Sequence, residues 1–224
     1  MNETSKTKLL FDENVLEILK GSGIDIGCGN DPVTEHVVMF DIEDGDANYI
    51  TKYIKQQFDF VFSSHCLEHM DDPSLALNEW WSLVKDYGHL IFAVPDEDLY
   101  EQGIFPSIFN EDHKYTFTIA KNKSWSPVSI NVLDLIKSLP NSKLIRLELQ
   151  DNNYDRRLCL HNIRNNKNNL EILKKPSATY KLIMQHVLFV RRFLLCYKTP
   201  IDQTLISDAV AQIFCIMQKI PNNS

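Results

Sequence analysis

The stretch that decides the fold is GSGIDIGCGNDP, residues 21–32. A short apolar segment carrying one acidic residue runs directly into two glycines, at positions 27 and 29. Glycine loses more backbone freedom on folding than other residues, so this pair indicates a sharp turn or a close approach of a ligand to the backbone. In an open parallel sheet, ligands bind beyond the carboxyl ends of the strands, which is where such a turn would lie.

Around this stretch, short apolar strands alternate with helical patterns through the first 150 residues. That alternation is typical of an α/β protein with a parallel sheet. Seven strands are expected, at 23–27, 37–41, 48–54 (the weakest), 58–64, 89–95, 142–151 and 208–219. Helices are expected at 14–20, at 73–86 with its end at Gly88, and at 126–140.

The composition describes an ordinary globular chain of 224 residues, with 44% hydrophobic and 24% charged residues. A net charge of -7 and the lack of a basic stripe argue against a nucleic-acid partner. The five cysteines are scattered without a CxxC pair, which predicts reduced thiols rather than disulfides or a zinc site. A polar N-terminus and the lack of a long apolar run predict a cytoplasmic protein without an integral membrane span.

Two regions interrupt the single domain expected over residues 1–224. Residues 96–125 show no clear periodicity, and we interpret them as a loop or lid over the acceptor, because long loops in compact domains tend to be functional. Residues 152–205 are expected to form a helical insertion before the last strand. The apolar helix at 178–198 within it could pack on the core, form a homodimer face or touch a membrane surface, and its few basic residues favour the first two.

Four segments, taken in order, resemble the class I S-adenosylmethionine (SAM)-dependent methyltransferases. They are GIDIGCGNDP (23–32), VVMFD (37–41), FDFVFSSHCLEHMDDP (58–73) and ALNEWWSLVKDYGHLIFAVPDED (76–98). The resemblance covers roughly residues 21–120, and it departs from the family pattern at Asp31, where a third glycine is common, and at 86–88, where Pro-Gly-Gly is common. It implies a Rossmann-like fold with a seven-stranded, mostly parallel sheet whose last strand is antiparallel.

The resemblance also implies SAM as the cofactor and S-adenosylhomocysteine (SAH) as the product. An acidic residue two positions before the first glycine would repel a pyrophosphate but suits an ammonium group. The implied cofactor contacts are Asp25, Gly27, Cys28, Gly29 and their neighbour Asn30 for the methionine portion, Asp41 for the ribose, Asp46 and Ala47 near the adenine, and Ser63 and Ser64 beside the sulfonium.

Methyl transfer leaves the problem of the acceptor's proton, and a base with a pKa near the working pH favours histidine. His65 follows a strand end directly and His113 lies in the long loop, so both are candidate catalytic residues, whereas His69 is expected to pack. Candidate acceptor contacts are Asp96, Glu97, Tyr100 and Tyr154. No recognisable set of metal ligands is expected.

We therefore expect O- or N-methylation of a small molecule. This version of the motifs resembles methyltransferases encoded among bacterial surface-polysaccharide genes, which implies a sugar, a nucleotide-sugar or a small phosphorylated amine as acceptor and a role in capsule or surface-glycan biosynthesis. The alternative is a SAM-binding partner subunit that no longer catalyses a reaction.

Overall fold

The computed structural model describes residues 2–119, 121, 123–159 and 200–221. The helix expected at 178–198, and with it the homodimer face, lies outside the described residues. Most of the insertion expected at 152–205 lies outside them too.

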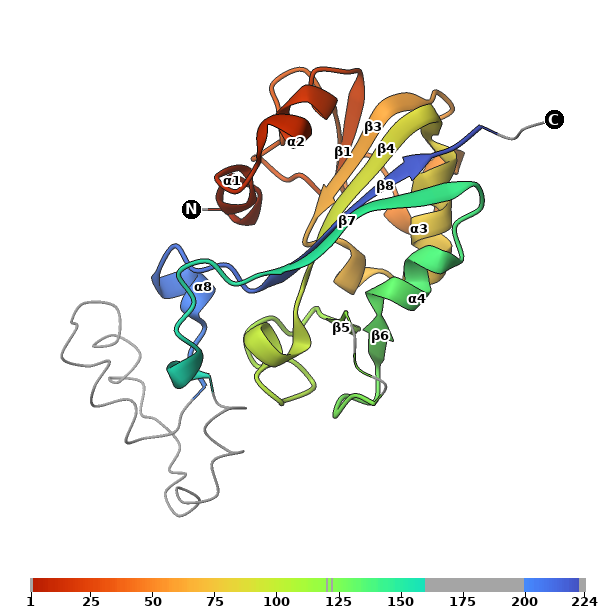
Figure 1. Cartoon of the computed structure of the whole chain (residues 1–224). Coiled ribbons are helices and arrows are strands. Elements are labelled where there is room, and N and C mark those ends of the chain that lie inside the picture. Colours follow the sequence, from red (N-terminus) through yellow and green to blue (C-terminus); the bar gives the residue numbers. More distant parts are fainter. Residues whose placement is uncertain (1, 120, 122, 160–199, 222–224) are drawn as a thin grey trace, which may run out of the picture.

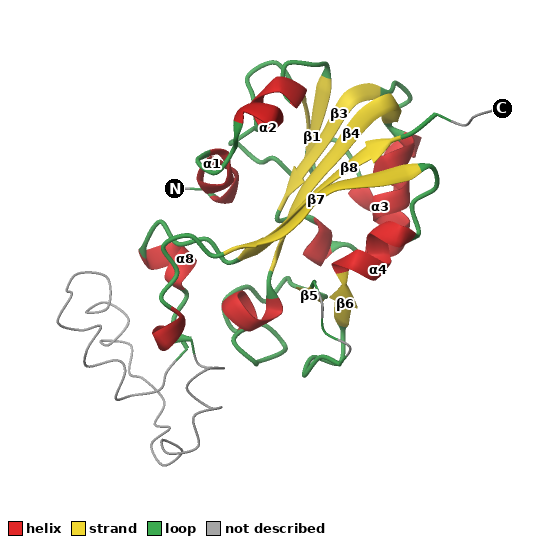
Figure 2. Ribbon diagram, viewed as in Figure 1, coloured by secondary structure: helices red, strands yellow, loops and turns green. Residues whose placement is uncertain are grey.

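A six-stranded sheet in the order β2-β1-β3-β4-β8-β7 forms the centre of the described part. The first four of these strands run parallel, and β8 is antiparallel to both of its neighbours. Figures 1 and 2 show helices on both faces of this sheet. The expected α/β fold, with a mostly parallel sheet and an antiparallel last strand, is confirmed. The strands are β1 (Gly23–Ile26), β2 (Val38–Phe40), β3 (Phe58–Ser64), β4 (Val84–Pro95), β7 (Ser142–Gln150) and β8 (Gln212–Lys219).

The prediction of a weak strand at 48–54 was wrong, so the sheet has six strands in the described residues instead of the expected seven. This segment forms the 3-10 helix η1 (Ala47–Lys52), because Asp46 caps it by accepting a hydrogen bond from the Asn48 N–H at 2.9 Å. The Trp80 indole donates to the Ala47 carbonyl at 2.9 Å and holds η1 against α3. Local capping and packing therefore outweigh the apolar pattern of the segment.

Each face of the sheet carries its own hydrophobic core. Helices α1 (Glu3–Lys8) and α2 (Glu13–Ile18) lie on one face, and α3 (Pro73–Ser82) and α4 (Val132–Lys137) lie on the other (Figure 1). Along β3, Phe60 and Phe62 enter the core with α2, whereas Val61 enters the core with α3. The continuous apolar run of β3 follows from this burial on both faces.

The expected helix at 73–86 is shorter, since α3 ends at Ser82 and β4 already begins at Val84. Gly88 therefore lies inside β4 and does not end the helix. A Cβ atom at this position would come within 2.8 Å of the Asp59 carbonyl oxygen, so glycine lets β4 approach the beginning of β3 closely.

The expected helix at 126–140 is also only partly helical. Its first part forms β6 (Ser129–Asn131), which pairs with β5 (Thr116–Thr118) in a separate two-stranded sheet, and only α4 follows as a helix. Asn131 caps α4 by accepting a hydrogen bond from the Leu133 N–H at 2.9 Å.

The segment after β4 crosses the carboxyl ends of the parallel strands (Figure 1). It contains the π-helical turn η3 (Glu97–Glu101) and β5, so the region expected to be an unstructured loop is partly ordered. The remaining short helices are η2 (Leu67–His69), η4 (Arg156–Leu158) and α8 (Gln203–Ile206). Within the described ranges, every helix is too short or too polar to cross a membrane, and the four cysteines found there are free.

Candidate functional site

A cavity of about 730 Å³ opens beyond the carboxyl ends of β1, β2 and β3. This volume lies in the range of pockets that bind small molecules and cofactors. It is lined by Gly27, Phe40, Asp41, Ile42, Gly45, Asp46, Ala47, Asn48, Tyr53, His65, Cys66, His69, Met70 and Lys114. The cavity therefore brings together four of the predicted cofactor residues and one predicted catalytic residue.

The sharp turn expected at the two glycines after β1 has a left-handed backbone, with φ of +76° at Gly27 and +52° at Gly29. A Cβ atom on Gly27 would lie 2.6 Å from both the Cβ and the Sγ of Cys66, whereas one on Gly29 would meet no atom within 4 Å. Gly27 is thus required by close packing inside the protein. Gly29 leaves open space at its side.

Asp41 joins this turn to the end of β2. One of its carboxylate oxygens accepts the Gly29 N–H at 2.6 Å, and the other accepts the Ile42 N–H at 2.7 Å. Each oxygen has two lone pairs, so both can accept a further hydrogen bond from a ligand in the cavity. This is the chemistry needed to hold a pair of sugar hydroxyls.

Asp25 is fully buried and does not line the cavity. One carboxylate oxygen accepts the Val33 N–H at 2.6 Å, and the other has no hydrogen-bond partner. Burial raises the pKa of Asp25 to about 7, against the opposing effect of the Val33 hydrogen bond. Asp25 therefore supports the glycine turn through its hydrogen bond to Val33, outside the cavity lining.

Five other predicted cofactor residues also lie outside the cavity lining. Cys28 is buried, whereas Gly29 and Asn30 are exposed. The Ser63 hydroxyl donates to the Ile26 carbonyl at 2.9 Å, and the buried Ser64 hydroxyl has no partner. Their neighbour Cys66, which the sequence interpretation missed, lines the cavity instead.

His65 lies where β3 ends, in a left-handed conformation with φ of +54° that turns the chain into the cavity wall. Its Nε2 lies 2.8 Å from the Gln212 side-chain oxygen, and its Nδ1 lies 3.5 Å from the Glu68 carboxylate. Burial lowers the pKa of His65, but the Glu68 carboxylate outweighs that effect, and the pKa rises to about 9. In this arrangement His65 is a hydrogen-bond donor rather than a base.

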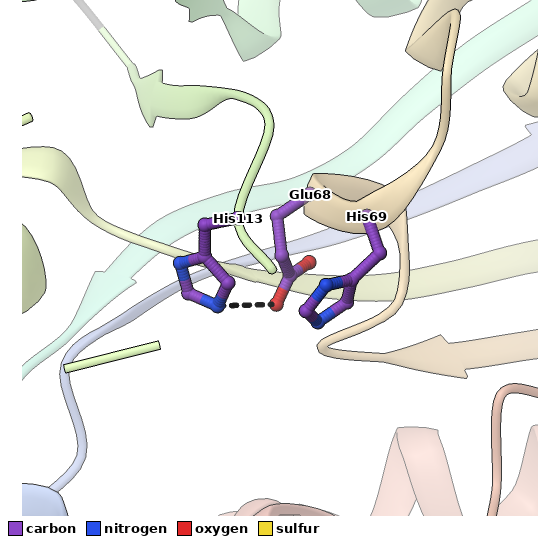
Figure 3. Close-up of side chains that lie close together, drawn as sticks. All are labelled: Glu68, His69 and His113. Atoms are coloured by element: carbon purple, nitrogen blue, oxygen red, sulfur yellow. Dashed lines mark ion pairs between the residues drawn. The ribbon is translucent and has the colours of Figure 1, made fainter. Parts of the chain in front are cut away.

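Glu68, His69 and His113 form a cluster beside the cavity, and their side chains point toward one another (Figure 3). The two histidines come from different segments. The Lys114 N–H donates to the Glu68 carbonyl at 2.9 Å and thereby ties the loop after η3 to η2. The ring centroids of His69 and His113 lie 5.0 Å apart. The sequence interpretation missed Glu68 and His69 as site residues, because nothing in the spacing shows that His113 folds back onto them.

The predicted acceptor contacts at the start of η3 have structural partners. The Asp96 carboxylate caps η3 by accepting the N–H groups of Asp98 and Leu99, and burial raises its pKa to about 6. Glu97 is fully buried, and its two oxygens bind hydroxyl groups from β5, β6 and the segment between them together with the Lys121 ammonium. Neither residue lines the cavity.

The two predicted tyrosines also lie outside the cavity lining. The Tyr100 ring contacts Phe109 edge-to-face and His113 in a tilted arrangement, with ring centroids 5.7 and 5.2 Å away. The Tyr154 hydroxyl donates to the Leu99 carbonyl at 2.5 Å and supports η3 from the other side. Tyr100 is thus adjacent to the histidine cluster, while Tyr154 holds its scaffold.

Comparison with protein families gives one match, to a family described as a methyltransferase domain, over residues 5–157. The matched region is more than half of the chain and includes the glycine turn, Asp41 and the Glu68 cluster. A search of curated proteins found no match.

Among solved structures, a candidate sarcosine dimethylglycine methyltransferase from Galdieria sulphuraria is 11% identical with a TM-score of 0.50, covering 96% of this chain and 86% of that one. A SAM-dependent methyltransferase from Thermotoga maritima, described as a possible histamine N-methyltransferase, is 16% identical with a TM-score of 0.46 over 97% and 87% of the two chains. Another from Archaeoglobus fulgidus is 16% identical with a TM-score of 0.47 over 97% and 94%. At 11% identity, the similarity to the Galdieria sulphuraria protein shows a shared fold and nothing more.

Proposed function

The chain belongs to the SAM-dependent methyltransferases with a methyltransferase domain, and from this premise we propose that it methylates an oxygen or nitrogen atom of a small polar molecule. SAM is its cofactor. When bound, SAM supplies an electrophilic methyl group on a sulfonium. The observation that carries the proposal is the cavity beyond β1 to β3, whose lining includes Gly27 of the glycine turn, Asp41 and His65.

The residues present fit this cofactor. The Asp41 carboxylate keeps lone pairs toward the cavity and would hold the ribose hydroxyls. Asp46 and Ala47, which also line the cavity, would lie near the adenine. The turn at Gly27 lets backbone instead of side chain form the wall beside the methionine portion.

The acceptor would enter from the side of η3, beneath residues 96–125, which we propose as the acceptor loop. Partial burial raises the pKa of the Tyr100 hydroxyl there, and four nearby carboxylates raise it further, those of Asp202, Glu101, Glu3 and Glu68. Such an acidic environment disfavours a phosphate-bearing acceptor. Of the acceptors that the family resemblance implies, it favours a sugar hydroxyl or an amine, in keeping with a role in surface-glycan biosynthesis.

His65 and His113 remain the proposed catalytic residues. His65 lines the cavity with its Nε2 bonded to Gln212 and its Nδ1 facing Glu68, and His113 is linked to it through Glu68. Alignment of the two reactants supplies much of the rate, since near-attack geometry contributes roughly 7–11 kcal/mol. Handling of the acceptor's proton contributes a further 10²–10⁴-fold or so.

The test is SAH release measured against a panel of sugars, nucleotide-sugars and amines, with SAM affinity measured separately by calorimetry. With the best acceptor, His65→Ala and His113→Ala should lower kcat by about 100-fold or more while the Kd for SAM changes by less than about threefold. Unchanged turnover in both variants would remove them from the reaction. SAM binding without turnover on any acceptor would instead support a non-catalytic partner subunit.

A further inference from the structure

We propose that Glu68, His69 and His113 bind a divalent transition-metal ion of the zinc type at the edge of the cofactor cavity. Their ligand atoms all lie within 4.8 Å of one another (Figure 3). Two imidazoles and one carboxylate form a ligand set used by catalytic zinc sites, which keep a fourth position open for water or substrate. Imidazole ligands disfavour magnesium and calcium, which prefer oxygen.

The first argument is the buried carboxylate of Glu68, which makes no hydrogen bond. Its side chain is 0% exposed, and neither of its oxygens accepts a hydrogen bond. Burying an ionised carboxylate without hydrogen bonds costs several kcal/mol. Its ion pairs with His65 Nδ1 and His113 Nε2 are long, at 3.5 and 3.9 Å from Oε1, so they compensate this cost only in part. A metal ion among these atoms would satisfy the carboxylate.

The second argument is independent of the first and concerns the far side of each imidazole ring. His113 Nδ1 lies 2.7 Å from the Glu101 carboxylate, and His69 Nδ1 lies 3.1 Å from the Asp112 carbonyl. Both partners are hydrogen-bond acceptors, so each Nδ1 carries the proton and each Nε2 keeps its lone pair. Metal-binding histidines are oriented in this way, by a carboxylate or carbonyl that holds the other nitrogen.

The pocket geometry indicates where the open position would face. His69 lines the cofactor cavity while Glu68 and His113 are buried behind it, so a metal ion bound by all three would be reached from the cavity. Zinc binds imidazole nitrogen at about 2.0–2.1 Å, so the three side chains must close inward by roughly an ångström, which the half-buried His69 can accommodate. If the proposed function holds, an acceptor oxygen or nitrogen on the metal would have a lowered pKa.

The rival explanation is a purely electrostatic network in which protonated histidines neutralise Glu68. It predicts that the cluster binds protons and no metal. The two explanations therefore differ in a measurable way that needs neither the acceptor nor turnover.

The experiment is a calorimetric titration of chelator-treated full-length protein with Zn²⁺, supported by the visible spectrum after Co²⁺ addition. The wild type should bind one equivalent, with a tetrahedral or five-coordinate Co²⁺ spectrum. Glu68→Gln and His69→Ala should each weaken Zn²⁺ binding by at least about 100-fold, and Glu101→Gln, which loosens His113, by about 10- to 100-fold. The exposed His36→Ala should bind as the wild type does.

Two outcomes of the Zn²⁺ titration would refute the metal site. Wild type that takes up less than a tenth of an equivalent of Zn²⁺ overturns the proposal, as does equal binding by Glu68→Gln, His69→Ala and the wild type. Thermal unfolding of the same samples shows whether each variant is folded. Calorimetry with SAM separates the two hypotheses, since Zn²⁺ binding without SAM binding would refute the proposed function alone, and SAM binding without Zn²⁺ binding would refute only the metal site.

Discussion

Replacing Asp41 with asparagine is expected to weaken SAM binding by about 100-fold without unfolding the protein. The carboxylate accepts the Gly29 and Ile42 N–H groups at 2.6 and 2.7 Å and would also accept the ribose hydroxyls. Hydrogen bonds to a charged group contribute about 1.5–3 kcal/mol each, against about 0.5–1.5 kcal/mol for neutral pairs. Asparagine keeps one accepting oxygen, but its N–H₂ group replaces the other oxygen and would face a hydrogen-bond donor, either the Gly29 N–H or the Ile42 N–H.

The loss therefore amounts to about one charge-assisted bond to the ligand and part of one bond to the turn, or roughly 3 kcal/mol in total. Since each 1.4 kcal/mol is a tenfold change in affinity, the Kd for SAM should rise by about two orders of magnitude. The same increase is expected for SAH, because the ribose is common to both molecules.

Calorimetry with SAM and SAH checks this prediction on the wild type, Asp41→Asn and the control Glu43→Gln. Glu43 is exposed two residues further along and does not line the cavity, so its substitution removes the same charge without touching the ligand. Thermal unfolding without ligand should shift by only a few degrees for either variant. A Kd for Asp41→Asn within threefold of the wild type, or an equal loss in Glu43→Gln, would show that Asp41 does not hold the ribose.

Two further predictions concern the turn itself. Gly27→Ala should lower the free energy of unfolding by about 3 kcal/mol, because the left-handed backbone and a Cβ 2.6 Å from Cys66 both destabilise the folded state. Gly29→Ala should lower it by only about 1 kcal/mol, because its backbone is left-handed but its surroundings are open. Equal losses for the two variants in urea unfolding would contradict this prediction. Because the pKa of Asp25 is higher in the folded protein than its usual 3.8, the folded state alone holds that proton between about pH 4 and 7, so the free energy of unfolding should fall by up to about 4 kcal/mol as the pH rises through this window. Asp25→Asn should flatten that dependence relative to the wild type in urea unfolding at pH 5 and 7.5, and an unchanged slope would assign it to other groups.

Sequence patterns predicted the features that depend on local chemistry. The apolar run of β3 predicted a buried strand, and the paired glycines predicted the sharp turn that the structure shows at Gly27. The family resemblance implied that Asp41 contacts the cofactor, and the structure places Asp41 in the cavity wall.

Errors arose where tertiary contacts outweigh local pattern. Residues 48–54 look strand-like, but the cap at Asp46 and the Trp80 hydrogen bond make them helical. Asp25 and Ser63 belong to the motif, yet the pleat of the sheet and the direction of the turn place them behind the cavity wall. Pattern recognition identifies which residues form the motif but not which side of the turn each one faces.

By itself, then, the sequence determined the alternating α/β class, the sharp glycine turn after the first strand and the resemblance to a methyltransferase family, because each depends on residues that are near one another in the chain. Only the tertiary structure decided which side chains share a surface. His113 meets Glu68 because the Lys114 N–H is bonded to the Glu68 carbonyl across more than forty residues of sequence. That contact, and the buried Glu68 carboxylate beside it that accepts no hydrogen bond, form only when the chain folds.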